Sequence, residues 1–167
     1  MSDEFQRLFE AEYAYVCRSL RRLGVRDADT IDVAQELFLL VYRELSRYDR
    51  NLPLRPWLYA FVVRLAANHR KLRRHAYERG GEDGLASATT GVDGGDVAAT
   101  RDLVLRALGA LDDDKRVVLV LFDLEGFDAK EIAVMIGVPP NTVYSRLRLA
   151  RAAFRAAVEA PPTGGAR

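Results

Sequence analysis

Apolar residues recur at intervals of three and four along most of the chain, and almost no strand-like alternation is present. The first run extends from Phe5 to Leu23, where Gly24 provides an expected helix end. A second helix is predicted from Asp29 to Ser46, and a third opens at Pro56. Positions expected to face inward on these two helices are Ile31, Ala34, Leu37, Phe38, Val41, Tyr42, Leu45, Leu58, Phe61, Val62, Leu65 and Leu72.

The helical pattern breaks once, in a stretch rich in Gly, Thr and Asp from Gly80 to Asp96. Helical periodicity then returns in two segments at about 101–111 and 113–124, with Asp112 as a cap and Gly126 as a stop. We therefore predict an all-α chain of two small helical domains, 1–76 and 101–160. A flexible acidic linker, 77–100, joins them, and 161–167 forms a disordered tail.

The segment from Phe127 onward is typical of a helix-turn-helix. Asp128 and Glu131 have the spacing of a capping box, Gly137 suits a left-handed helix end, and Pro140 suits the first position of a second helix. That second helix carries the candidate DNA-binding residues Pro140, Asn141, Thr142, Tyr144, Ser145, Arg146, Arg148 and Arg151. The alternative is an ordinary pair of antiparallel helices with a solvated arginine face.

Charge is unevenly distributed although the net charge of the 167 residues is only +1. This near-neutral total argues against a protein that coats nucleic acid indiscriminately. The segment from Arg64 to Arg79, however, contains six basic residues and one acidic residue. Trp57 and Tyr59 precede this segment. Aromatic rings beside cations suit single-stranded nucleic acid, because bases stack on the rings and phosphates pair with the cations. The alternative is that the aromatics are core residues and the basic run is a solvated helix end.

Residues for catalysis, a cofactor or a metal are not evident. Cys17 is the single cysteine, so the chain cannot form an intramolecular disulfide, and this fits a reducing compartment. The Cys17 side chain is expected to be buried. His69 and His75 have no carboxylate or cysteine at metal-ligand spacing, and no glycine-rich phosphate loop is present. Without a membrane-length apolar run or signal peptide, we expect a cytoplasmic protein with no membrane insertion and no small-molecule substrate.

Asp32, Gln35 and Glu36 share one polar face of the second predicted helix. Taken alone, this is an ordinary solvated face that is able to dock a basic partner helix. The motif Asp32-Val-Ala-Gln-Glu-Leu-Phe38, together with Arg55-Pro-Trp-Leu-Tyr59 and Thr142-Val-Tyr-Ser-Arg-Leu147, resembles the extracytoplasmic-function sigma factors of bacterial RNA polymerase. The resemblance extends over both domains in order.

The resemblance implies a role in promoter recognition, DNA opening and transcription initiation. It assigns contacts with the β′ clamp helices to Asp32, Gln35, Glu36 and Phe38, and it adds the β subunit as a partner. It assigns the −35 element to the helix-turn-helix residues named above. The −10 element falls to Tyr48, Asn51, Trp57, Tyr59, Arg64, Asn68, Arg70, Lys71, Arg73 and Arg74. An anti-sigma factor is a further expected partner.

Some positions depart from the family pattern. Arg64 stands where Asn is frequent, and Tyr144 and Leu149 stand where basic residues are frequent. Two alternatives to a sigma factor stay open on sequence alone. One is a stand-alone helix-turn-helix regulator with a ligand-sensing or dimerisation domain. The other is an adaptor of the transcription machinery that does not bind DNA.

Overall fold

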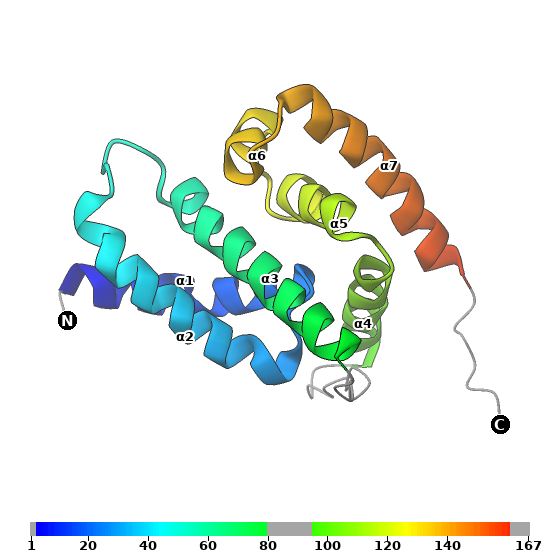
Figure 1. Cartoon of the computed structure of the whole chain (residues 1–167), viewed down its shortest axis with the longest axis horizontal. Coiled ribbons are helices and arrows are strands. Elements are labelled where there is room, and N and C mark those ends of the chain that lie inside the picture. Colours follow the sequence, from blue (N-terminus) through cyan, green and yellow to red (C-terminus); the bar gives the residue numbers. More distant parts are fainter. Residues whose placement is uncertain (1–2, 80–94, 161–167) are drawn as a thin grey trace.

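The computed structural model describes residues 3–79 and 95–160, and every regular element within those ranges is a helix (Figure 1). The N-terminal half, residues 3–79, contains α1 (Asp3–Arg22), α2 (Asp27–Glu44), the short 3₁₀ turn η1 (Leu45–Arg47) and α3 (Leu54–Glu78). The C-terminal half, residues 95–160, contains α4 (Gly95–Gly109), α5 (Asp113–Leu119), the π-helical segment η2 (Val120–Leu124), α6 (Ala129–Ile136) and α7 (Pro140–Glu159). The prediction of an all-α chain is confirmed.

The N-terminal half is a three-helix unit held by aliphatic and aromatic side chains. Val16, Leu37 and Val62, one from each helix, are fully buried, and a buried side chain of this size contributes about 1.5–3 kcal/mol. The ring of Phe38 lies 4.8 Å from that of Phe9 and 6.4 Å from that of Phe5, in edge-on arrangements. These contacts fix α2 against α1.

The C-terminal half packs α4, α5 and α6 around α7. Asp112 caps α5, as predicted, because its side chain accepts a hydrogen bond from the backbone N–H of Lys115. The buried Arg116 closes the end of α4. Its guanidinium donates hydrogen bonds to the carbonyl oxygens of Leu108 at 2.8 Å, Gly109 at 3.1 Å and Leu111 at 3.0 Å. Arg116 thereby supplies hydrogen-bond donors to carbonyl groups at a helix end, where intrahelical N–H partners run out.

The two halves share one continuous hydrophobic core. Figure 1 shows α5 and α6 beside α3, with α7 along the outer side. The Tyr59 ring of α3 lies 4.9 Å from the ring of Phe127, which precedes α6. The two predicted helical domains are therefore packed against each other here. The segment 80–94 and the tail 161–167, predicted as linker and disordered end, lie outside the described residues.

Several expected inward positions face solvent. The exposed fraction is 69% for Leu72, 55% for Ile31 and 47% for Tyr42, so their predicted burial is wrong. Leu72 lies in the last turns of α3, where every residue from Lys71 to Glu78 except the half-buried Arg73 is exposed. Helix α3 also begins at Leu54 rather than Pro56, and α4 begins at Gly95, inside the segment predicted as linker.

Candidate nucleic-acid interface

Helices α6 and α7 form the helix-turn-helix predicted from the sequence. Asp128 Oδ1 accepts hydrogen bonds from the backbone N–H of Lys130 at 2.8 Å and of Glu131 at 2.9 Å. The Glu131 carboxylate in turn accepts from the Asp128 N–H at 2.9 Å, which completes the capping box. Gly137 ends α6 with φ of +70°, and Pro140 is the first residue of α7. These predictions are confirmed.

Packing of α7 determines which of its residues are available to a partner. Val143, Leu147 and Ala150 are buried against the other helices of the C-terminal half. The first two turns consequently expose a polar set near the helix N-terminus, while Thr142 is half-buried. The exposed residues there are Pro140, Asn141, Tyr144 and Ser145, and Arg148 is exposed in the next turn.

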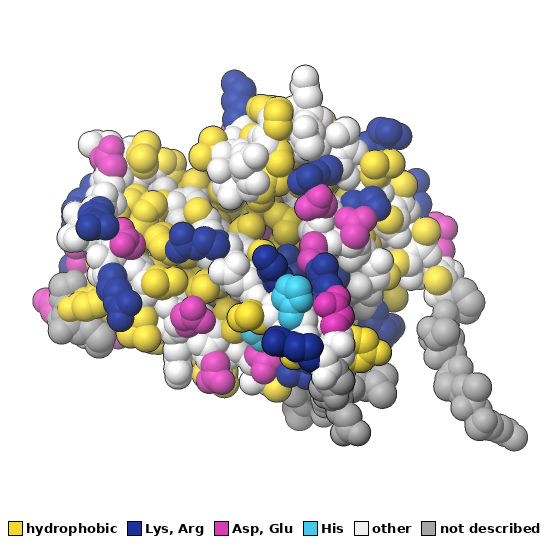
Figure 2. Space-filling view, viewed as in Figure 1, with side chains coloured by type: hydrophobic (Ala, Val, Ile, Leu, Met, Phe, Trp, Pro, Cys, Tyr) yellow, Lys and Arg dark blue, Asp and Glu magenta, His cyan; other side chains and the backbone are white. Residues whose placement is uncertain are grey.

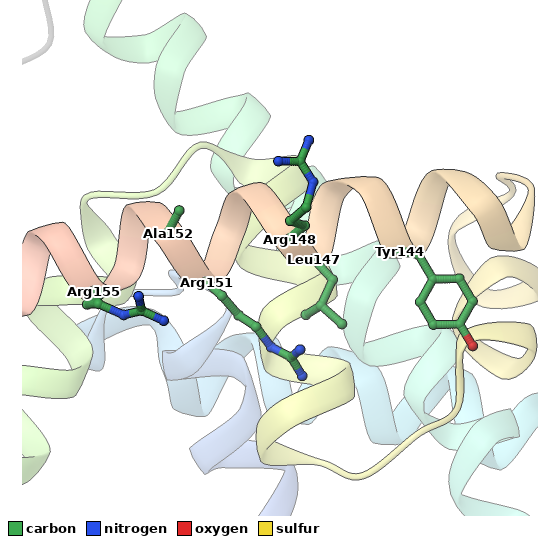
Figure 3. A pocket seen from close by; sticks show the side chains of 6 residues that line it. All are labelled: Tyr144, Leu147, Arg148, Arg151, Ala152 and Arg155. Atoms are coloured by element: carbon green, nitrogen blue, oxygen red, sulfur yellow. The ribbon is translucent and has the colours of Figure 1, made fainter.

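The arginines of α7 differ in their surroundings. A shallow groove of about 380 Å³ follows the outer face of the helix, and Figure 3 shows Arg148 and Arg151 beside it with their guanidinium groups pointing apart. Arg151 pairs with Asp123 of η2, at 2.9 and 2.5 Å, and this hydrogen-bonded contact raises the pKa of Arg151. Arg146 Nη2 lies 2.8 Å from Asp114 Oδ2. Within residues 3–79 and 95–160, Arg148 forms no salt bridge.

An aromatic stack marks the beginning of α3. The half-buried Trp57 ring lies 4.7 Å from the Tyr48 ring and 5.0 Å from the Phe61 ring. The Tyr48 hydroxyl donates to the carbonyl of Leu52, which fixes the loop before the helix. In the same loop, the backbone and side-chain N–H groups of Asn51 donate to Asp49 Oδ1, each at 2.9 Å. The loop and the start of α3 therefore form one ordered surface.

Further along α3, the basic residues fall into two groups. Arg64 lies over the Phe61 ring at 5.3 Å from its centroid, and Lys71 is exposed, as is the neutral amide of Asn68. The other three are held by carboxylates. Arg70 and Arg74 each pair with Asp113 of α5, and Arg73 lies 3.3 Å from Asp29. Figure 2 shows basic (dark blue) and acidic (magenta) side chains intermixed around the cyan histidine side chains.

Two predicted contact residues are buried. Tyr59 is 0% exposed, its ring packs between Tyr15 and Phe127, and its hydroxyl pairs with Ser19 Oγ. This burial raises the pKa of Tyr59 well above its ordinary value. Phe38 is 3% exposed in the aromatic cluster of the N-terminal half. The expectation that either side chain lies on a contact surface is corrected for this arrangement, in which both fill core volume.

The polar face of α2 is solvent-exposed as the sequence indicated. Asp32, Gln35 and Glu36 are all exposed. Beside them lies Leu39, 61% exposed, which the sequence analysis did not single out. Its position four residues after Gln35, on the polar side of the helix, was the available signal. Leu39 therefore adds an apolar side chain to the exposed polar face of α2.

Sequence reasoning also missed three acidic partners. Asp113 and Asp114 stand in a run of three aspartates whose local pattern indicates only a helix start, and Asp123 follows a buried segment. In the structure each of them holds an arginine from the candidate DNA-binding set. No local pattern identifies such pairs, since their members lie far apart in the sequence.

Some kinds of site are absent from the described part of the chain. No helix there has an apolar stretch of sufficient length to cross a bilayer. Nor do residues 3–79 and 95–160 contain three or more His, Cys, Asp or Glu side chains grouped to hold a metal ion. The exposed chemistry is that of a binding protein with one helix-turn-helix and one aromatic and basic helix, a class that acts on DNA.

Comparison with known families identifies the class. The family model described as Sigma-70 region 2 matches residues 8–77, and the model described as Sigma-70, region 4 matches residues 101–154. The chain belongs to the sigma-70 family of RNA polymerase sigma factors, in its extracytoplasmic-function group. It functions in promoter recognition and transcription initiation.

Individual relatives are distant in sequence but match over most of their length. The RNA polymerase sigma factor CnrH of Cupriavidus metallidurans is 28% identical over 166 residues, covering 93% of this chain and 87% of the relative. The ECF RNA polymerase sigma-E factor of Escherichia coli K12 is 28% identical over 159 residues, covering 88% and 83%.

Two solved structures share the fold. CnrH in complex with the cytosolic domain of CnrY has a TM-score of 0.70 at 24% identity and covers 95% of this chain and 89% of that chain. The sigma factor RpoE in complex with the anti-sigma factor NepR, from Bartonella quintana, has a TM-score of 0.75 at 16% identity, covering 96% and 100%.

Proposed function

We propose that this sigma factor contacts a promoter with two helices, α7 on duplex DNA at the −35 element and α3 on the opened −10 element. The observation that carries the proposal is the exposed polar N-terminus of α7 in the same chain as the exposed Asn68 and Lys71 of α3. The chain itself catalyses no reaction in this proposal. Because its proposed partners are bacterial RNA polymerase and promoter DNA, the protein would act in the bacterial cytoplasm.

On the −35 element, different residues of α7 would position the helix on the DNA backbone and read the base sequence. Asn141, Thr142 and Ser145 lie in the first two turns, the part of a recognition helix that approaches base edges. Arg148 lies further along and is suited to a phosphate, since a long cationic side chain follows the backbone without reading sequence. Tyr144, 56% exposed, extends the same surface at a position where the resemblance to the family implies a frequent cation.

On the −10 element, the aromatic stack and the exposed polar residues of α3 would receive an unpaired strand. Removing a base from the duplex stack costs a few kcal/mol, which a protein surface offsets by stacking and hydrogen bonding. Trp57 lies at the start of α3 between Tyr48 and Phe61, Asn68 lies about three turns further along the helix, and Lys71 lies about four turns further along. Arg64, held over Phe61, adds a cation between them.

Lys71 offers a direct test, because it is exposed and its loss removes one cation with little structural consequence. Lys71→Ala should weaken binding of the full chain to a single-stranded −10 oligonucleotide. It should also reduce the salt slope by about 0.7, the value for one phosphate on a single strand. Titration at two salt concentrations measures both. Arg101→Ala, an exposed cation on α4, is the matched control and should leave the slope unchanged. A slope that falls equally in both variants contradicts a local contact at Lys71.

Docking to core RNA polymerase would use the outer face of α2, where Asp32, Gln35 and Glu36 are exposed beside Leu39. The proposed partner is the pair of β′ clamp helices, with the β subunit as a second contact. Phe38 supports this face from beneath rather than touching polymerase, because it is buried against α1.

Replacing Gln35 and Glu36 together with Ala should weaken binding to core polymerase by roughly tenfold, the effect of losing about 1.4 kcal/mol of interface contacts. Helical content should be unchanged, because both residues are exposed and Ala is the best helix former. Co-elution at low concentration, followed by run-off transcription, measures the effect. Gln6→Ala, another exposed amide on α1, is the control. If the double variant co-elutes with core polymerase as well as the wild type does, the outer face of α2 is not the docking face.

An anti-sigma partner completes the proposal. Both structural relatives named above were solved with a regulatory partner, the CnrY cytosolic domain in one case and NepR in the other. By analogy, we expect a protein of this kind to bind this chain and keep it from polymerase. Run-off transcription with and without the candidate regulator tests the analogy. A stand-alone regulator would instead bind promoter DNA equally well without polymerase.

A further inference from the structure

The contact between α3 and α5 joins the proposed −10 surface to a carboxylate of the other half. Asp113 Oδ1 lies 2.9 Å from Arg70 Nε, and Asp113 Oδ2 lies 3.0 Å from Arg74 Nη2. Both arginines belong to the set proposed to bind the −10 strand. A single aspartate is therefore paired with two of the arginines that are proposed to bind promoter DNA.

Arg70 is the more deeply held of the two. Its side chain is only 10% exposed, and its Nη1 donates a hydrogen bond to the Leu23 carbonyl as well. Burial lowers the pKa of Arg70, which the neighbouring Asp113 carboxylate partly offsets. Arg74 keeps 63% of its side chain exposed, yet its guanidinium faces the same carboxylate. Arg70 has no room for a phosphate while α5 lies against α3.

A second charged contact closes the other end of the interface between the halves. Glu125, whose side chain is 0% exposed, accepts a hydrogen bond from Arg22 Nη1 at 3.0 Å and lies at the same distance from Ser19 Oγ. Ser19 also pairs with the hydroxyl of Tyr59. The C-terminal half thus supplies carboxylates at two places, and the N-terminal half supplies their hydrogen-bond donors.

We infer that Asp113 competes with promoter DNA for Arg70 and Arg74, so that α5 must leave α3 before α3 binds the −10 strand. The inference rests on the proposed function of α3. Carboxylate and phosphate oxygens accept hydrogen bonds from the same guanidinium N–H groups, so a carboxylate already bound to an arginine competes with a phosphate for it. The apparent affinity for the strand is then reduced by the fraction of chains in which the halves are separated.

The test is Asp113→Asn in the full chain. This substitution keeps the size of the side chain and removes its charge, which weakens both ion pairs. Binding to a fluorescent single-stranded −10 oligonucleotide should tighten by roughly threefold to tenfold, the range expected when partly screened ion pairs are lost. The radius of gyration in small-angle scattering should increase. Asp113→Ser provides a second variant of the same kind, with circular dichroism as the check on folding.

The matched control is Asp112→Asn, which makes the same charge change one residue away. The Asp112 carboxylate holds Lys115 Nζ at 2.5 Å and caps α5, and Asn keeps the capping ability. Its affinity for the oligonucleotide should match that of the wild type. In a chain that carries Arg74→Ala, the gain from Asp113→Asn should be smaller, because one of the two released arginines is absent.

The outcomes separate this inference from the proposed function. Tighter binding by Asp113→Asn but not by Asp112→Asn supports the competition. Equal tightening in both variants overturns it, because net charge alone then explains the gain. Unchanged affinity in Asp113→Asn and Asp113→Ser also overturns it, while a wild-type preference for the −10 sequence and a loss in Lys71→Ala would leave the proposed function standing. A wild-type chain without preference for the −10 strand over a scrambled one contradicts both.

Discussion

Gly24→Ala should lower the free energy of unfolding by roughly 3 kcal/mol or more, the largest stability effect expected from a single methyl group in this chain. Gly24 has φ of +91°, which an L side chain rarely adopts, and an added Cβ would overlap Arg116 Nη1. Arg116 cannot move away freely, because its guanidinium holds the carbonyls of Leu108, Gly109 and Leu111 at the end of α4. Urea unfolding followed by circular dichroism measures the loss.

Two other glycines separate backbone strain from crowding. Gly137 has φ of +70° but open space around its Cβ position, so Gly137→Ala should lose only about 1–2 kcal/mol. Gly109 has neither a positive φ nor a neighbour within 4 Å, and Gly109→Ala should change stability by about 0.5 kcal/mol or less. If Gly24→Ala were no more damaging than Gly137→Ala, the close approach of Arg116 would be energetically unimportant.

Asn141→Ala should relax the preference of the full chain at one or two −35 base pairs. The expected loss is about 1–3 kcal/mol at those positions, the value of one bidentate base contact. The reason is its exposed position in the first turn of α7, the end that approaches base edges. Binding to a panel of −35 duplex variants measures the change. Affinity for the non-preferred duplexes should stay nearly constant.

Arg148→Ala is the complementary change and should weaken binding to every duplex in the panel alike. Its salt slope should fall by about 0.9, the value for one phosphate on B-DNA. Arg151→Ala should have a smaller effect, because Arg151 is already engaged by Asp123. Asn141 is expected to read bases and Arg148 to bind a phosphate. This assignment is wrong if Arg148→Ala alters the base preference while Asn141→Ala leaves it unchanged.

The helix-turn-helix could be predicted from the sequence because its determinants are local. Asp128 with Glu131, Gly137 and Pro140 each set the backbone within three or four residues of themselves. Capping and left-handed backbone depend little on distant packing. The same holds for Asp112 at the start of α5. The exposed face of α7 follows from the same periodicity, since Val143, Leu147 and Ala150 recur at helical spacing and are buried.

The surroundings of α3 could not be predicted because they depend on contacts between distant segments. Tyr59 stands beside Trp57 in a motif that suggests a common surface, yet Phe127, almost seventy positions away in the chain, covers its ring. Arg70 is similarly part of a basic run whose partner, Asp113, lies in the other half. Composition indicates that such residues suit nucleic acid, but only tertiary packing decides whether they are accessible.

The junction of Gly24 and Arg116 sets a condition for exchanging halves between members of this family. A chimaera that joins residues 3–79 to a foreign C-terminal half places a new side chain against the small space at Gly24. The incoming half must supply an arginine at 116, anchored on its own helix end, and carboxylates at 113 and 125 to receive Arg70 and Arg22. Recombination that ignores these positions would join two well-folded pieces whose facing surfaces no longer fit.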